Sequence, residues 1–358
     1  MNTEDVSVLM LNYNHGHYLP RAINAVLTQS VRPREFIIID DASTDDSISV
    51  LEKFARQDPV IRVVRCERNQ GVVPNNNRGL RMCTSEYIIA AAADDYLLPG
   101  MIERSMAVLR QNPQVGMSCG YWRLLIESTG ETRQYKTDWG TAPAYMSPAQ
   151  LAESIHGGTL PTPSAIFRRE ALLRAGAYHN ELHWHADWFA AMVVAFRDGI
   201  CYVPDALAVQ TVREASHLHA GIRDTAAQRA VMTEALKLLL SPEYQDVLPF
   251  FQSSGIMTSY GRHLVEAAAG LPQRWSPAVL GLISGMELEV YASLLDDDNP
   301  EVRSLARFLL GPMWKWRMQE MAHLRSVSER LNRFMTTPMG RLWRRMGRLK
   351  GVIRRLAG

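Results

Sequence analysis

The 358-residue sequence predicts an α/β fold, in which a mostly parallel sheet is flanked by helices and followed by a C-terminal helical extension. Two observations predict this fold. Apolar runs of strand length alternate with apolar residues at helical spacing through the first third of the chain. Several of these runs also end in polar turn residues, as parallel strands do where they enter a loop at one edge of a sheet.

Four runs rich in apolar residues are predicted as strands, at residues 6–11, 36–39, 60–64 and 87–92, and the last is expected to be buried on both faces of the sheet. The strand–helix–strand order favours right-handed crossovers and a parallel sheet. Ser43 and Asp46 fit a capping box at the start of the second helix. Apolar residues at helical spacing indicate the first two helices between the strands: Leu19, Ile23, Val26 and Leu27; Ile48, Leu51 and Phe54. Leu80 and Met82 are assigned to a third helix, which leads into the fourth strand.

Two adjacent carboxylates, Asp94 and Asp95, follow the fourth predicted strand. Ligands of α/β sheets bind at the carboxyl ends of the strands. A hard divalent cation prefers oxygen ligands and often joins a protein carboxylate to substrate phosphates. The pair therefore predicts a metal and phosphate site, with a solvated turn as the alternative because aspartate is common in turns.

The same strand register places Tyr13, Asp41 and the Asp94–Asp95 pair at one edge of the sheet. None of the loops at this edge has the glycine pattern of a dinucleotide fingerprint or of a Walker phosphate loop. If a nucleotide binds here, we expect its diphosphate to be neutralised by a metal rather than by a glycine-rich cradle.

Charge is distributed unevenly along the chain, whose net charge is +2. Residues 341–358 hold seven basic residues and no acid, which leaves 32 basic and 37 acidic residues in the rest. Within this tail an apolar helical face (Leu342, Met346, Leu349, Ile353 and Leu356) opposes the arginines. The pattern is typical of a helix that lies on an anionic membrane surface. A nucleic-acid arm, which we do not expect, and a helix docked on its own domain are the alternatives.

The remaining composition points to the cytoplasm. The four cysteines, Cys66, Cys83, Cys119 and Cys201, are widely spaced and are expected to be reduced. The N-terminus lacks the pattern of a signal peptide. No stretch approaches the ~20 apolar residues of a membrane span. We therefore expect a cytoplasmic protein held peripherally at the inner face of the membrane.

Five sequence blocks in the first part of the chain carry a family resemblance. They are Val6–Asn14, Ile37–Asp45, Asn69–Gly71, Asn77–Leu80 and Asp94–Pro99. Together they resemble the nucleotide-binding half of the family 2 glycosyltransferases of the GT-A fold, and the resemblance extends over about the first 220 residues. It implies a Rossmann-like, mostly parallel sheet and a nucleotide-sugar donor.

The resemblance also implies roles for individual residues. Asp41 would contact the uracil ring, and Tyr13 would line the base pocket. Asn77 would belong to the nucleotide site as well. Asp94 and Asp95 would hold Mn²⁺ or Mg²⁺ against the diphosphate.

Towards the acceptor side, His183–Trp188 stands where the family carries its catalytic base, and Asp187 matches that base. A base is needed because a sugar hydroxyl is a poor nucleophile until its proton is removed. A helix N-cap is the alternative role of Asp187 and is compatible with the first. Arg213 and His217 fall where the family often has residues near the diphosphate.

Two histidines beside that base, His183 and His185, would lie on one side of a strand if the segment were extended. With His217 and His219 they suggest a His-rich metal site. Their spacing matches no known site, so we interpret them as exposed or acceptor-lining residues.

Three departures from the family pattern keep a second function open. Ala92 occupies the first acidic position of the metal block, Asn76 replaces a common arginine, and Ala186 replaces the usual glutamate before the base. We predict metal-dependent, inverting transfer of a sugar, from UDP in the first instance, to a glycan or lipid-linked acceptor in cell-surface polysaccharide synthesis. The alternatives are an inactive scaffold that binds a nucleotide sugar or glycan, and a nucleotidyltransferase.

The predicted domain organisation has three parts. Residues 1–220 form the glycosyltransferase domain, with a nucleotide-binding half (1–112) and an acceptor half (113–220). Residues 221–335 form the helical extension, and 336–358 form the basic tail helix. Within the acceptor half we expect a strand at 115–121 and loops at 127–150.

Overall fold

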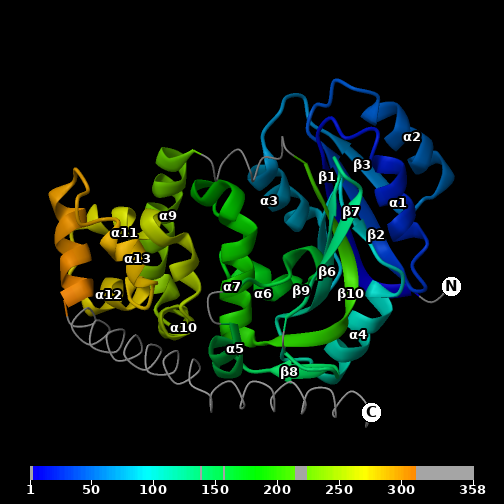
Figure 1. Ribbon diagram of the computed structural model, residues 1–358. Helices are drawn as coiled ribbons and strands as arrows, with labels where there is room; N and C mark the ends of the chain where they lie inside the picture. The colour runs from blue at the N-terminus through cyan, green and yellow to red at the C-terminus, as the bar shows by residue number, and fades with distance from the viewer. Residues whose placement is uncertain (1–2, 138, 156–157, 214–223, 312–358) are drawn as a thin grey trace, which may run out of the picture. The chain divides into compact units, whose positions relative to one another are not determined.

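The computed structural model describes residues 3–137, 139–155, 158–213 and 224–311 (Figure 1). Contacts divide the chain into two units, Met1–Met286 and Glu287–Gly358. The boundary predicted near residue 220 therefore falls inside the first unit. In the second unit, helix α13 (Leu288–Ala292) and a helix at 300–311 are described. The predicted helix at 313–335 and the basic tail lie outside the described residues.

The first half of the sheet is built from parallel strands. Strands β1 (Thr3–Asn12), β2 (Arg32–Asp40), β3 (Ile61–Arg65) and β4 (Tyr87–Ala92) lie in the order β3-β2-β1-β4. Helices α1 (Leu19–Leu27), α2 (Ser47–Gln57) and α3 (Val72–Met82) connect them. All four predicted strands and all three predicted helices are confirmed. Figure 1 shows these elements in blue and cyan.

Apolar side chains cover both faces of this half-sheet, as expected for buried parallel strands. Val8 and Met10 of β1 point into the core formed with α1. Leu9, on the opposite face, contacts α3, where a Cβ added to Gly79 would lie 2.2 Å from Leu9 Cδ1. Helices on the two faces of the sheet therefore leave only its edges open to ligands.

The second half of the sheet is mixed rather than wholly parallel. Strands β6 (Met117–Ile126) and β10 (Ile200–Val212) run parallel to each other. Strand β9 (Ile166–Arg168) is antiparallel between β4 and β6, and β5 (Tyr96–Leu97) is antiparallel on β10. Helix α4 (Met101–Gln111) connects β5 to β6.

The segment predicted as loops at 127–150 contains regular structure, which corrects that prediction. Strand β7 (Glu131–Tyr135) pairs with β6, strand β8 (Ala144–Met146) pairs with β10, and helix α5 spans Pro148–Ile155. Every residue of β7 is exposed. Its polar sequence lacks the alternation of a half-buried strand, so the sequence pattern gives no strand signal.

Helices make up most of the rest of the first unit. The segment before β10 contains η1 (Thr162–Ser164), α6 (Arg169–Arg174), η2 (Asn180–His185) and α7 (Ala186–Asp198). Helix α7 is apolar nearly all round and has nine buried residues, so it is a core helix. After β10 come α9 (Thr225–Leu240), η3 (Pro242–Tyr244), α10 (Leu248–Ser254), η4 (Ile256–Tyr260), α11 (Gly261–Ala269) and α12 (Pro277–Ile283).

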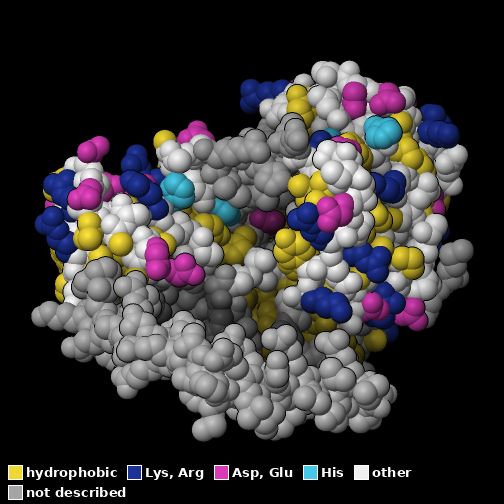
Figure 2. Space-filling view, in the orientation of Figure 1, with side chains coloured by type: hydrophobic (Ala, Val, Ile, Leu, Met, Phe, Trp, Pro, Cys, Tyr) yellow, Lys and Arg dark blue, Asp and Glu magenta, His cyan; other side chains and the backbone are white. Residues whose placement is uncertain are grey.

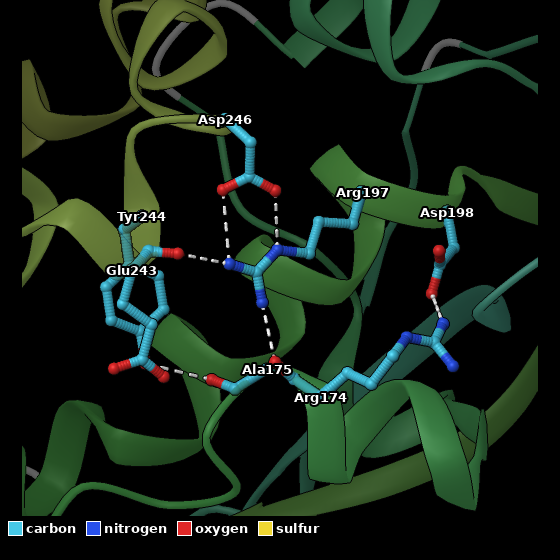
Figure 3. A network of polar contacts seen from close by, with 7 residues as sticks. All are labelled: Arg174, Ala175, Arg197, Asp198, Glu243, Tyr244 and Asp246. Atoms are coloured by element: carbon cyan, nitrogen blue, oxygen red, sulfur yellow. Dashed lines mark hydrogen bonds and ion pairs between the residues drawn. The ribbon is translucent and has the colours of Figure 1, made fainter.

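A polar network joins the helical extension to α6 and α7 (Figure 3). The Arg197 guanidinium donates to both carboxylate oxygens of Asp246, at 2.8 and 3.1 Å. It also donates to the backbone carbonyls of Arg174 and Glu243, each at 2.6 Å. The Tyr244 hydroxyl donates to the Ala175 carbonyl. Because the guanidinium of Arg197 in α7 bonds both to the end of α6 and to the segment 243–246, the helices after β10 are anchored to the acceptor half.

The charged side chains and the cysteines are distributed as in an ordinary globular protein. On the face shown in Figure 2, acidic and basic side chains are interspersed over the described surface. All four cysteines are buried and form no disulfide, as predicted. None of the helices in the described ranges has the length and apolar composition of a membrane span.

Candidate nucleotide-sugar site

The predicted edge residues follow strands that end side by side. Strands β1 and β2 end in register, with Asn12 opposite Asp40. The N–H of Asp41, which follows β2, donates to the Asn12 carbonyl at 2.8 Å. Strand β4 is paired with the other side of β1. Tyr13, Asp41 and Asp94 therefore leave the sheet at the same carboxyl edge, as predicted.

The loops after β1 and β2 are interlocked by side chains. The Asn14 N–H donates to Ser43 Oγ at 2.9 Å, and Asn14 Oδ1 accepts the Thr44 N–H at 2.7 Å. Asn14 and Ala42 have positive φ angles of 55° and 62°. Such angles are uncommon outside glycine, and residues of this kind cluster at functional sites.

The predicted capping box is wrong because its serine is used elsewhere. The Ser43 hydroxyl donates to Asp40 Oδ2 at 2.7 Å and accepts from the Asn12 amide at 3.1 Å. Helix α2 begins at Ser47 after Asp46, whose side chain makes no capping hydrogen bond. Ser43 therefore stabilises the edge of the sheet instead of the helix.

Asp41 fixes a third loop to this edge. Its two carboxylate oxygens accept the N–H groups of Gln70 and Gly71, each at 2.8 Å. Asp41 is buried, whereas Tyr13 is 43% exposed. The proposed contacts of Asp41 and Tyr13 with a nucleotide base stay predictions.

Asn77 joins the two halves of the domain. Its amide nitrogen donates to the Tyr178 carbonyl at 2.7 Å, and its amide oxygen accepts the Tyr178 N–H at 3.0 Å. Both polar ends of the side chain are thus engaged with the loop before η2. The structure gives Asn77 a positioning role, and its contact with a nucleotide stays a prediction.

Asp94 forms an ion pair with a residue 119 positions later in the chain. The Arg213 Nη2 atom lies 2.6 Å from Asp94 Oδ2 and 3.0 Å from His15 Nε2. Burial lowers the pKa of His15, so this imidazole is neutral at pH 7 and accepts from the guanidinium. Arg213 thus lies beside Asp94, and its proximity to a diphosphate stays a prediction. His217 and His219 lie outside the described residues.

Two residues that the sequence analysis missed fix the Asp94 backbone. Arg21 Nη2 and the Thr211 hydroxyl both donate to the Asp94 carbonyl, at 2.8 and 2.7 Å. Arg21 also donates to Thr211 Oγ1 at 3.1 Å. These residues come from α1 and β10, and no motif in the sequence marks them.

Asp95 points into the protein, which argues against its predicted role as a metal ligand. Its Oδ1 atom accepts the Thr211 N–H at 2.7 Å. Asp95 borders a cavity of about 30 Å³ whose other lining residues, such as Met10 and Val26, are mostly apolar. Burial, followed by the neighbouring charge of Asp94, raises the pKa of Asp95 to about 8. Without a bound cation this carboxyl is largely protonated at pH 7, whereas a cation beside it would favour the ionised form, so the role of Asp95 as a metal ligand stays a prediction.

The candidate base lies in the first turn of α7. Helix α7 begins at Ala186 with His185 as its N-cap, so Asp187 is not the N-cap residue that the alternative required. Asp187 Oδ1 accepts the Trp188 N–H at 2.7 Å. Although Asp187 reaches solvent, the protein around its carboxyl partly desolvates it and raises its pKa, an effect that the Trp188 N–H opposes.

Two phenols lie within electrostatic reach of this carboxylate. Burial, and then the charge of Asp187, raises the pKa of Tyr178 and that of Tyr260. Tyr178 is held by Asn77, and Tyr260 ends η4 in the helical extension. The surroundings of Asp187 therefore come from three separate parts of the chain.

The paired histidines do not share one side of a strand, contrary to the prediction. They belong to the 3₁₀ helix η2, where His183 is exposed and His185 is buried. Within the described ranges, no three His, Cys, Asp or Glu side chains converge on one point. The interpretation of His183 as an exposed residue is confirmed.

A comparison with protein families identifies the part of the chain that carries this edge. Residues 7–175 match the model of "Glycosyl transferase family 2". This part of the chain is a family 2 glycosyltransferase domain. An uncharacterized glycosyltransferase of Haemophilus influenzae is 30% identical over 134 residues, which are 37% of this chain and 42% of that relative. The match thus covers less than half of the relative's own length.

Solved structures resemble the family 2 domain and the helices that follow it. Staphylococcus aureus TarS 1–349, solved with UDP-GlcNAc, superposes with a TM-score of 0.59 at 18% identity, covering 87% of this chain and 92% of that one. The mannosyltransferase PcManGT of Pyrobaculum calidifontis, solved with GDP-Man and Mn²⁺, gives 0.51 at 21% identity, covering 87% and 86%. These likenesses confirm the GT-A fold predicted from the five sequence blocks.

The residues of the glycosyltransferase domain leave one acid suited to a divalent cation. Ala92 carries no carboxylate, and Asp95, which is only partly exposed, is largely protonated in the absence of a cation. The remaining acid, Asp94, is 13% exposed in its side chain and accepts the Arg213 guanidinium through Oδ2. Because Mg²⁺ is often bound through one or two carboxylates, with waters and substrate phosphates completing its shell, this single acid fits a minimal site.

The wild-type domain should become less stable to unfolding as the pH rises, because Asp95 loses its proton. Replacing Asp95 by asparagine should abolish this pH dependence. The folded state keeps a proton up to about pH 8, whereas the unfolded chain releases it near the ordinary aspartate value of 3.8. The stabilisation is therefore complete below about pH 4 and is lost as the pH rises through about 8. Melting temperatures of both proteins, measured in EDTA from acid to alkaline pH, should diverge in favour of Asp95→Asn.

A matched control is Asp205→Asn, which alters an exposed acid paired with Arg104. This variant should follow the wild-type pH profile. Parallel curves for the wild type and Asp95→Asn would show that Asp95 is ionised in the folded protein, and Asp95 would then return as a candidate metal ligand.

Proposed function

We propose that this chain transfers a sugar from a nucleoside diphosphate sugar to a hydroxyl group of a glycan or lipid-linked acceptor, with inversion at the anomeric carbon. The observation that carries the proposal is the Asp94–Arg213 pair at the carboxyl edge, beside the interlocked loops after β1 and β2. A cationic guanidinium next to a carboxylate suits a diphosphate group and the cation that accompanies it.

The proposed donor is a UDP-linked sugar. S. aureus TarS has been solved with UDP-GlcNAc and with UDP, and PcManGT with GDP-Man, so both of these proteins with a similar fold bind nucleotide sugars. In this proposal exposed Tyr13 lines the base pocket, and Asp41 contacts uracil while holding the loop at Gly71. We further propose a role in the synthesis of cell-surface polysaccharide.

The proposed mechanism is a single in-line displacement. Asp187 accepts the proton of the acceptor hydroxyl while that oxygen forms a bond to the anomeric carbon. The bond between the anomeric carbon and the diphosphate oxygen breaks, and the nucleoside diphosphate leaves. Arg213 stabilises the negative charge that develops on the leaving group. This stabilisation is large because an oxocarbenium-like transition state separates positive and negative charge.

We propose that Asp94 holds Mn²⁺ or Mg²⁺ when the donor is bound. Such an ion would act as a Lewis acid on the departing diphosphate. The ion held by Asp94 and the Arg213 guanidinium would then place two cationic groups at the leaving group. His15, which accepts from Arg213, would orient that guanidinium.

A screen of nucleotide sugars tests the proposed function. UDP-GlcNAc, UDP-glucose and GDP-mannose are added with and without Mn²⁺, and melting temperature and hydrolysis of the donor are measured. We expect one donor to stabilise the protein and to be slowly hydrolysed. Stabilisation without hydrolysis or transfer would instead favour an inactive scaffold, for which Ala92 and Ala186 are the specific observations. No response to any nucleotide would contradict both functions.

We also propose that residues 341–358 bind an anionic membrane, although they lie outside the described residues. Seven basic residues supply an attraction of up to about 1 kcal/mol each near such a surface. A chain ending at Gly340 should therefore fail to float with liposomes that contain anionic lipid, whereas the full chain should float. Added salt should weaken flotation only in part, because salt screens the basic residues but not the apolar residues of the predicted helix. Equal flotation would mean that the tail does not bind the membrane.

A further inference from the structure

The turn that precedes Asp187 is strained. His183 lies inside η2 with φ 45° and ψ −115°, a combination far from helical values and from the usual left-handed region. A non-glycine residue keeps such a conformation only where its surroundings impose it, and residues of this kind cluster at functional sites. The strain therefore directs attention to what holds the turn and to what the turn presents.

A buried amide from the helical extension holds the turn. Gln228 of α9 is 3% exposed, and its Oε1 accepts the Trp184 indole N–H at 3.0 Å. Its amide nitrogen lies 3.0 Å from His185 Nε2. Burial lowers the pKa of His185 to about 4, so this imidazole is neutral and accepts the hydrogen bond. One side chain thus fixes the two residues that follow the strained His183.

Aromatic rings line the same turn. The exposed His183 ring stacks on Trp184, with centroids 5.8 Å apart and planes inclined by 25°. Tyr260 of η4 meets His185 and Trp188 edge-on, at 5.0 and 5.3 Å. A sugar ring has an apolar C–H face and a polar rim, so it suits aromatic rings that have polar edges.

We propose that His183 and Trp184 form a subsite for the sugar ring of the acceptor, beside Asp187. Gln228 is a positioning residue for this subsite and is supplied by the helical extension. The inference rests on the proposed function, since Asp187 is the proposed base. The acceptor is the fitting occupant because the edge proposed to bind the donor is built from the loops after β1, β2 and β4.

The subsite is tested by binding of simple sugars in the presence of UDP. Methyl β-glycosides of glucose, galactose and N-acetylglucosamine serve as probes, and saturation-transfer NMR measures their contact with the protein. The full chain should give a signal with at least one glycoside. Trp184→Ala should reduce that signal at least fivefold, and His183→Ala should reduce it as well. Trp275→Ala is the matched control, because Trp275 is an exposed tryptophan of the helical extension, and it should leave the signal unchanged.

Kinetics with a carbohydrate acceptor give the second readout. Trp184→Ala should raise the acceptor KM by roughly tenfold, which corresponds to a lost contact of about 1.4 kcal/mol. The donor KM should not change. Gln228→Met, which keeps the shape but loses both hydrogen bonds, should also raise the acceptor KM, and Gln228→Glu, which keeps an acceptor for Trp184, should recover part of the loss.

The outcomes separate this inference from the proposed function. If donor binding and hydrolysis are normal but Trp184→Ala behaves like Trp275→Ala, the subsite is wrong and the proposed function stands. Absence of any glycoside signal from the wild-type protein would also overturn the subsite. If no nucleotide sugar binds or is hydrolysed, the proposed function itself fails.

Discussion

Replacing Asp187 by asparagine should lower turnover by about 10²–10⁴-fold, the range typical for loss of a general base. The asparagine side chain has nearly the same shape and still offers an oxygen to the Trp188 N–H, so the fold should persist. Donor affinity should barely change, because Asp187 is proposed to act on the acceptor. The measurements are kcat with saturating donor and the Kd for the nucleotide sugar.

Glu181→Gln provides the control for this variant. Glu181 is an exposed carboxylate in the first turn of η2, and its loss should leave turnover unchanged. If Asp187→Asn weakened donor binding while turnover of bound donor survived, Asp187 would belong to the donor site or to the fold. The pH profile adds a second check. Because the pKa of Asp187 is raised, the acid limb of kcat should lie above the usual aspartate range.

The parallel half of the sheet could be predicted because most residues of its strands β1, β2 and β4 are buried. Such strands read as continuous apolar runs, and each ends where polar residues begin, as at Asp40 and Asp94. Strand β7 has neither property, since it is exposed along its whole length and pairs only at the edge of β6. The helices after β10 show a different limit. Helical spacing predicts that they exist, but the contact of Gln228 with η2 depends on tertiary packing.

The candidate site shows the same division between local and tertiary information. The edge position of Asp94 follows from strand register alone, so the sequence predicts it. The opposite environments of Asp94 and Asp95 depend on Thr211, which lies more than 100 residues later and fixes both residues. Asn77 likewise bonds to Tyr178, a partner 101 residues away. No spacing rule in the sequence connects such residues, which is why Arg21 and Thr211 were missed.

Removing the carboxylate of Asp94 should abolish sugar transfer and the part of nucleotide binding that depends on Mn²⁺. In Asp94→Ala the carboxylate proposed to hold the cation is lost, and Arg213 loses the ion-pair partner that lies 2.6 Å away. The proposed cation is therefore lost and the Arg213 guanidinium is no longer held by Asp94, and both would stabilise the negative charge that develops on the leaving group. The fold should survive, because the Asp94 carbonyl, which Arg21 and Thr211 hold, is unchanged.

Asp205→Ala is a suitable control for Asp94→Ala, because it breaks the surface ion pair with Arg104, whose members are 53% and 39% exposed. Exposed pairs of this kind contribute about 0–1 kcal/mol, so this variant should keep full activity. The decisive measurement compares the rise in melting temperature that UDP produces with and without Mn²⁺. The wild type should show a larger rise with the metal, and Asp94→Ala should show the same rise in both conditions. Full transfer activity of Asp94→Ala at saturating donor would rule out Asp94 as the metal ligand and would leave Arg213 as the group that neutralises the diphosphate.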